Sequence, residues 1–177
     1  MVSAYQSSMP SQQEVDAFCM AAGQWQQRDY ALVKKMLDTY GDAIVDGEYS
    51  DSGITALMYA ANYGETEIAA LLLAHGADVN HKSGTGDTPL MSASWYTGNR
   101  DTVRLLLESG ADPDAKNNDG KTALMIAQEN RKDSLTDIVG LLEQWEDVRD
   151  FSIALKQDIP ALRPFSVPKT KSRGLKP

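Results

Sequence analysis

The chain has few of the residues on which catalytic, metal-binding and disulfide-stabilised proteins depend. Its 177 residues include one cysteine, Cys19, and two histidines, His75 and His81. A single cysteine excludes an internal disulfide framework and fits a reducing compartment. We interpret Cys19 as a small buried apolar residue, because no histidine lies near it in the sequence.

Long apolar runs are also missing. No window approaches the roughly 18 apolar residues that a membrane-spanning helix requires. The first residues, MVSAYQSSMPSQQE, have neither the basic start nor the apolar region of a signal peptide. We therefore expect a cytoplasmic protein with no membrane partner. Met1 and Met9 are both candidates for the native start, and residues 1–10 are expected to form a disordered N-terminus.

Motifs for catalysis and for metal or phosphate binding are absent or incomplete. His75 and His81 flank Asp78, but no third ligand pattern supports a zinc site. Residues 84–88, GTGDT, lack the lysine of a phosphate loop and lead into Pro89, which favours a hairpin. No Gly-x-Ser-x-Gly or His-Glu-x-x-His motif occurs. We therefore expect no enzymatic activity, no cofactor and no metal.

Charge is plentiful but unevenly distributed. Residues 1–147 contain 10 Lys/Arg and 23 Asp/Glu, a net charge of −13, whereas residues 148–177 contain 7 and 2, a net charge of +5. An acidic body repels phosphates, so we expect no nucleic-acid partner. Attraction between opposite charges favours contact between the basic tail and its own body.

The strongest pattern is a repeat of 33 to 34 residues. Each copy starts at a threonine whose hydroxyl can cap the N–H groups of a short helix: Thr55, Thr88 and Thr122. Pro89 suits the first position of such a helix. A second apolar run, 68–73 or 102–107, ends at a glycine that can adopt the left-handed C-terminal cap, Gly76 or Gly110.

These motifs resemble those of the ankyrin-repeat family. The tetrapeptides are TALM, TPLM and TALM at 55–58, 88–91 and 122–125, followed by LLLAHGADVN at 71–80 and LLLESGADPD at 105–114. The resemblance covers roughly residues 14–147. It implies an all-α solenoid of about four helix-turn-helix repeats with hairpin fingers. The family histidine is replaced by Met58, Met91 and Met125, so we expect apolar contacts there in place of histidine hydrogen bonds.

The repeats predict a domain order. After residues 1–10 we expect a degenerate capping repeat at 11–49, ankyrin repeats at 50–82 and 83–116, a C-terminal ankyrin repeat at 117–149, and at 150–177 a short helix and an extended Pro/Lys/Arg-rich basic tail. Residues 40–51 are expected to form the first finger.

The first repeat carries its own helix patterns. Ser11 and Glu14 predict a capping box. The periodicity predicts that the helix from Gln12 buries Val15, Phe18, Cys19 and Ala22. A second helix at about 30–37 is expected to place on one buried face Leu32, Val33, Met36 and Leu37.

The end of the last repeat is unusually apolar. Trp145, Val148 and Phe151 continue a spacing of three, although end repeats normally carry a polar outer face. We expect residues 159–165 to dock on the last repeat and the residues from Lys169 onward to be mobile.

The resemblance implies recognition through a concave surface of fingers and first helices. Tyr63, Trp95 and Tyr96 are the expected aromatic anchors, although Trp95 can instead pack across the neighbouring turn. Asn80 occupies the position that asparaginyl hydroxylases modify in some ankyrin proteins, and we expect its side chain to bridge backbone groups of the turn. The candidate partner-binding residues are Tyr49, Asp51, Ser52, Ile54, Asn62, Tyr63, Lys82, Thr85, Asp87, Trp95, Tyr96, Lys116, Asn118, Asp119, Lys121, Glu129 and Asn130.

We interpret the chain as a non-catalytic module that binds a protein or peptide and is monomeric when unbound. Two alternatives remain open. The acidic face can mask a basic partner, in the manner of an immunity or antitoxin protein. The basic tail of one copy can also lie against the acidic surface of another, which would make the chain a structural assembly protein.

Overall fold

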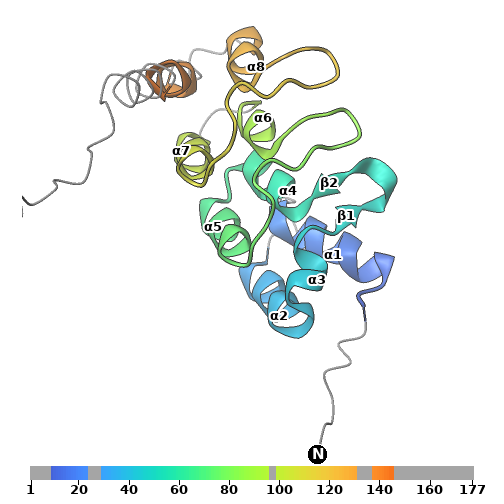
Figure 1. Ribbon diagram of the computed structural model, residues 1–177. Helices are drawn as coiled ribbons and strands as arrows, with labels where there is room; N and C mark the ends of the chain where they lie inside the picture. The colour runs from blue at the N-terminus through green and yellow to red at the C-terminus, as the bar shows by residue number, and fades with distance from the viewer. Residues whose placement is uncertain (1–8, 24–28, 96–98, 131–136, 146–177) are drawn as a thin grey trace, which may run out of the picture.

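The computed structural model describes residues 9–23, 29–95, 99–130 and 137–145, which form two layers of short helices (Figure 1). The inner layer contains α1 (Gln12–Gly23), α4 (Ala56–Tyr63), α6 (Pro89–Ala93) and α8 (Ala123–Glu129). The outer layer contains α2 (Tyr30–Tyr40), α5 (Thr66–Ala74) and α7 (Arg100–Glu108). Residues 137–145 are also helical. The inner helices contact one another in the order α1, α4, α6, α8.

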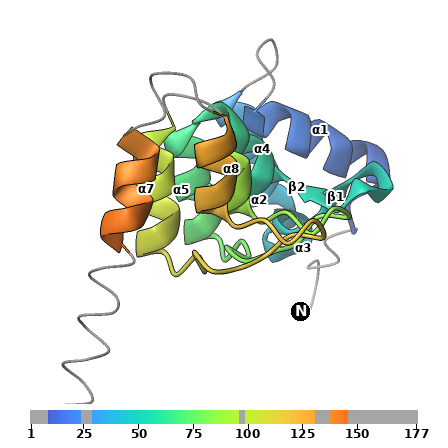
Figure 2. The same ribbon diagram turned by 90° about the horizontal axis from the view of Figure 1, so that it is seen from above.

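Each outer helix is connected to the next inner helix by a finger, at residues 46–55, 77–88 and 111–122. The fingers extend away from α5 and α7 (Figures 1 and 2). The first contains β1 (Glu48–Tyr49), a short 3₁₀ turn η1 (Ser50–Ser52) and β2 (Ile54–Thr55). The strands are antiparallel, with Glu48 opposite Thr55. The expected N-terminal disorder and the expected tail docking lie outside the described residues.

The threonine caps are confirmed. The hydroxyls of Thr55, Thr88 and Thr122 accept hydrogen bonds from the backbone N–H of the methionine three residues later, at 3.3 to 3.4 Å. Pro89 occupies the first turn of α6. Gly76 and Gly110 follow α5 and α7 with φ of 88° and 94°, which a side chain would disfavour. The sequence therefore specifies where these helices begin and end.

The core is a continuous stripe between the layers and between the repeats. Leu57 and Leu90 are fully buried, and Met58 and Met91 are 2% and 1% exposed. The expected apolar contact in place of histidine is thus present at these two positions. At Met125 it is not, because 46% of this residue is exposed to solvent.

The first repeat departs from expectation in two places. Val33, Met36 and Leu37 are buried as expected. Leu32 is 37% exposed, so the prediction that it lies on the buried face was wrong. The first finger, at residues 46–55, also begins and ends later than the expected residues 40–51. Gly41 ends α2, and the chain then forms the single turn α3 (Asp42–Val45), because Ile44 and Val45 gain burial in the core.

Cys19 is buried, as expected, together with Val15, Phe18 and Ala22. Its thiol donates to the carbonyl oxygen of Gly47 at 3.4 Å. Burial, and then the charge of Asp16, raise the pKa of this thiol to about 12. Cys19 is therefore a structural residue that stays protonated at neutral pH.

The start of α1 is held by the expected capping box. The Glu14 carboxylate accepts hydrogen bonds from the Ser11 backbone N–H at 2.8 Å and from the Ser11 hydroxyl at 2.7 Å. The hydroxyl of Tyr40, on α2, also donates to Glu14. Donation by Tyr40, and then by Ser11, lowers the pKa of the Glu14 carboxyl from 4.5 to about 2.

Asn99, which precedes α7, connects two repeats. It is 4% exposed, and its side-chain amide donates to the carbonyl oxygens of Ala61 (3.1 Å), Asn62 (3.0 Å) and Ala93 (3.2 Å). These carbonyls belong to the last turns of α4 and α6, where helical acceptors lack intrahelical donors. One side chain therefore satisfies the ends of two neighbouring inner helices.

The Glu14 contacts predict a pH-dependent stability. Because the folded state lowers the pKa of Glu14, its carboxylate stabilises the fold above about pH 4.5, and this contribution disappears as the pH falls towards 2. Glu14→Gln should lower the melting temperature at pH 7 and lose this difference near pH 2. Tyr40→Phe, which removes the main donor, should reproduce part of the effect. Equal pH profiles for Glu14→Gln and the parent would contradict this role.

Asn99→Ala should destabilise the protein by about 2 kcal/mol, because it removes a buried side-chain donor that three carbonyl oxygens share. Urea unfolding followed by circular dichroism measures the change. Asn118→Ala is the matched control, because that exposed side chain donates one hydrogen bond, to the carbonyl of Gly84. We expect it to cost less than about 1 kcal/mol. Similar costs for the two variants would argue against the bridging role of Asn99.

Candidate functional site

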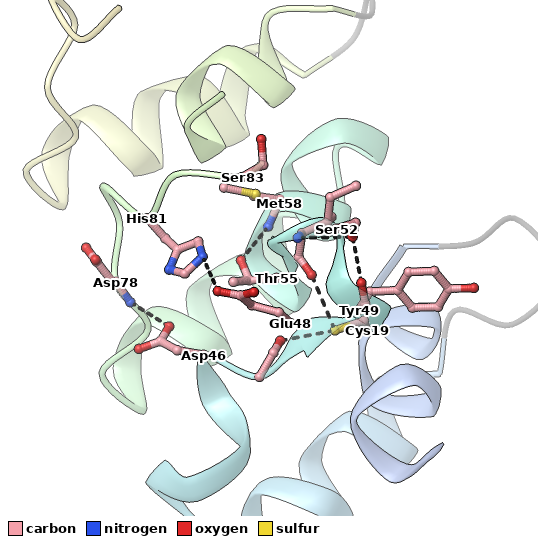
Figure 3. A network of polar contacts seen from close by, with 12 residues as sticks. Cys19, Asp46, Glu48, Tyr49, Ser52, Thr55, Met58, Asp78, His81 and Ser83 are labelled. Atoms are coloured by element: carbon pink, nitrogen blue, oxygen red, sulfur yellow. Dashed lines mark hydrogen bonds and ion pairs between the residues drawn. The ribbon is translucent and has the colours of Figure 1, made fainter. Parts of the chain in front are cut away.

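The bases of the fingers are joined by polar side chains at equivalent positions of successive repeats. Asp46 accepts from the Asp78 backbone N–H at 2.9 Å (Figure 3). One repeat later, Asn80 accepts from the Asp112 N–H at 2.8 Å and donates to the Gly110 carbonyl at 3.1 Å. The expectation that Asn80 bridges backbone groups of its own turn is confirmed in part: the side chain contacts backbone groups, but they belong to the following repeat.

The tips of the fingers are joined through the backbone. The Gly84 N–H donates to the Ser52 carbonyl, and the Asn118 N–H donates to the Thr85 carbonyl, both at 3.0 Å. Gly86 has φ of 79°, and a Cβ atom there would lie 2.6 Å from Oδ1 of Asn118. The glycines at 84–88 therefore belong to a hairpin tip and its close contact with the next finger, as expected.

Several candidate binding residues are engaged in contacts within the protein. Asp87 accepts from the Thr85 hydroxyl at 2.8 Å and from the Asn117 amide at 2.7 Å. Lys82 donates to the carbonyl of Lys116 at 3.3 Å. Lys121 and Glu129 form an ion pair of 2.5 Å, and Glu129 raises the pKa of the lysine. A partner must compete with these contacts to use the same side chains.

Tyr49, one of the candidate aromatic residues, is half-buried. It packs edge-on against Tyr59, with ring centroids 5.7 Å apart. Tyr63 is also half-buried, and its ring lies close to the Cα of Gly23 at the end of α1. These two rings therefore contribute to packing between repeats.

Trp95 is the aromatic candidate that the structure leaves open to solvent. It follows the end of α6, and 45% of the residue is exposed. The alternative that Trp95 simply packs across the neighbouring turn therefore accounts for only part of its surface. Tyr96, the adjacent candidate, lies outside the described residues.

The remaining candidates differ in exposure. Lys116, Asn118 and Asp119 are exposed near the tip of the third finger, whereas Ser52, Ile54, Asn62 and Asn130 are half-buried. The side chain of Asp51 lies outside the part of the chain that the structure describes. The structure thus distributes the candidates along the fingers and the inner helices, with Trp95 as the large exposed group.

Neither histidine belongs, among the residues that the structure describes, to a group of side chains that could bind a metal ion. His81 lies 3.3 Å from the Glu48 carboxylate on the first finger (Figure 3). His75 caps the end of α5 through its backbone N–H. Within the described residues no group of three His, Cys, Asp or Glu side chains could hold a metal ion. No helix among these residues is both long enough and apolar enough to cross a bilayer.

A hollow of about 370 Å³ lies at the end of the helices that points away from the fingers, where the turn between α4 and α5 meets α2. Tyr30 and residues 64–68 line it. None of the candidate binding residues belongs to this hollow.

Sequence reasoning missed two residues that organise the site, Asn99 and Asp46. For Asp46 a signal existed, because it precedes Asn80 by 34 residues, the repeat length. For Asn99 there was none, since the equivalent residue of the preceding repeat is Glu65. Its role depends on the approach of three carbonyl groups from two other helices.

The architecture agrees with a comparison with known protein families. The family model described as ankyrin repeats, in three copies, matches residues 18–117, which is more than half of the chain. The matched segment begins within α1 and contains α2 to α7 and the first two fingers. Proteins of this kind generally act by binding other proteins. The chain therefore belongs to the ankyrin-repeat family.

Proposed function

We propose that the chain is a non-catalytic binding module that grips a protein or peptide on the surface formed by its fingers and inner helices, with Trp95 as an anchor. The observation that carries this proposal is the 45% exposure of Trp95 in a stack that buries most of its other apolar residues. Partly exposed aromatic residues supply large contact areas at protein interfaces, and a central tryptophan often contributes about 2 kcal/mol or more.

The connections between the fingers support the same proposal. Asp46, Asn80 and Asn118 each bond to the backbone of a neighbouring finger. A surface held in this way has little conformational freedom to lose when a partner binds, so more of the contact energy appears as affinity. The fingers are therefore suited to recognition of one shape.

A second function is favoured by the charge of the described residues, which contain 7 Lys/Arg and 20 Asp/Glu. Exposed carboxylates are frequent on the finger side: Asp46, Glu48, Asp78, Asp112, Asp114 and Asp119. Charge complementarity sets specificity and association rate. These residues support a partner with a basic surface, which the chain would mask, as an inhibitor does.

Trp95→Ala should weaken partner binding by roughly 30-fold, the equivalent of about 2 kcal/mol. The test is a pull-down from the native source with the parent and the variant as baits, quantified by mass spectrometry, followed by titration of the enriched protein. Tyr30→Ala is the matched control, because Tyr30 is equally exposed, at 46%, but lies on the outer helix α2 beside the hollow.

The Tyr30→Ala control distinguishes binding at Trp95 from binding at the hollow. Proteins lost with Trp95→Ala and kept with Tyr30→Ala support the proposed site. The reverse pattern would transfer binding to the hollow, and full retention by Trp95→Ala would remove the anchor role. Circular dichroism should show that both variants are folded.

If the partner is basic, its affinity should fall steeply between about 50 and 500 mM salt, because screening shortens the reach of exposed charges. Asp119→Asn should reduce the association rate and weaken this salt dependence. Glu67→Gln, an equally exposed position on the outer helix α5, should leave both unchanged. An affinity that does not change with salt would contradict the masking function. It would still be compatible with Trp95 as an aromatic anchor.

A further inference from the structure

The methionine at the fourth position of the repeat tetrapeptide is buried in two repeats and exposed in the last. Met58 in α4 is 2% exposed and Met91 in α6 is 1% exposed, but Met125 in α8 is 46% exposed. The leucine before it follows the same trend, because Leu57 and Leu90 are fully buried whereas Leu124 is half-buried. We call Leu124 and Met125 the end face.

The position of α8 explains the exposure. The inner helix α4 lies between α1 and α6, and α6 lies between α4 and α8. Among the described residues, α8 has an inner-helix neighbour on one side only (Figure 1). The side that a following repeat would cover is therefore the side on which the end face lies.

The other end of the stack is finished differently. On α1, Gln13 is exposed and polar, whereas the exposed Gln12 donates to the Glu48 carbonyl of the first finger at 2.9 Å. The first turn of α1 is closed by the contacts of Glu14 with Ser11 and Tyr40. A repeat stack needs polar outer faces at its two ends, and the exposed Met125 is an apolar group on the last inner helix.

The chain itself supplies a segment that matches the end face. Residues 159–165, IPALRPF, place apolar side chains at intervals of three, at Ile159, Leu162 and Phe165. Residues 159–177 contain five Lys/Arg and no Asp/Glu, whereas the described residues have the acidic excess given above. Both apolar character and charge therefore favour contact of this segment with the stack.

The connection is long enough for this contact. Thirteen residues, 146–158, separate the described helical residues 137–145 from Ile159. Thirteen residues span about 20 Å even when fully helical, at about 1.5 Å per residue, and more when extended, whereas packed helices lie about 10 Å apart. Covalent attachment also gives the segment an effective concentration on the order of 1 mM, so even weak docking is populated.

We propose that residues 159–165 cover Leu124 and Met125 of the same chain, in the place that the inner helix of a following repeat would occupy. The segment closes the C-terminal end of the stack and removes an apolar face that would otherwise favour association with other molecules.

The test uses the methionine methyl groups as reporters. Protein labelled with ¹³C at the methionine methyls is exposed to a soluble nitroxide, which broadens the NMR signals of accessible methyls. In the full chain the Met125 methyl should be broadened about as little as those of Met58 and Met91. In a variant that ends at Asp158, broadening of Met125 should at least double, in line with docking populated by attachment. Met125→Leu assigns the signal.

Met58 and Met91 are internal controls, because their signals report whether the shortened protein remains folded. A second variant, Ile159→Ser with Leu162→Ser and Phe165→Ser, keeps the length and the charge of the tail. It should expose Met125 as the truncation does. If Met125 is equally broadened in the full chain and in both variants, the segment does not cover the end face and the proposal is wrong.

Measurements at two protein concentrations that differ tenfold identify the source of the cover. Protection of Met125 that is the same at both supports contact within one chain. Protection that increases with concentration, together with a larger mass in light scattering, would assign the cover to a second copy and overturn the proposal.

Discussion

The fold depends on one constraint, that each helix pair must have its apolar face covered by the next pair. None of these short helices could be stable alone, since isolated helices of this length are marginal in water. Burial of Leu57, Met58, Leu90 and Met91 between successive inner helices supplies the stabilisation. A stack built in this way has no natural end, so its two ends require separate solutions.

A second set of contacts, almost entirely polar, fixes the fingers without using the core. Asp46 and Asn80 repeat the same bond at the finger bases, and Asn99 joins the ends of α4 and α6. Each of these bonds crosses from one repeat to its neighbour. The apolar contacts hold the repeats together, and the polar contacts set their register. Residues that take part in neither, such as Trp95 and Asp119, can then change without loss of the fold.

Much of the fold followed from the sequence because the relevant signals are local. A threonine cap, a glycine that adopts positive φ and an apolar period each act within a few residues, as Thr55 and Gly76 illustrate. The errors arose where residues that are distant in the sequence determine the exposure or the contacts of a side chain. Leu32 fits the face of α2 by periodicity, but 37% of it remains in solvent. The use of Asp87 in a contact between two fingers was equally invisible, because its partner Asn117 is 30 residues away.

The candidate site was harder to predict for the same reason. Family position identifies which residues can face a partner, but exposure depends on what neighbouring repeats cover. Tyr63 and Trp95 stand at nearly equivalent positions at the ends of inner helices, yet the first packs near Gly23 and the second remains 45% exposed. In a linear stack each repeat contacts only its neighbours. The exposure of Trp95, and with it the proposed recognition there, therefore depends on the second and fourth repeats. A loss of order at the C-terminal end would affect Trp95 through α8.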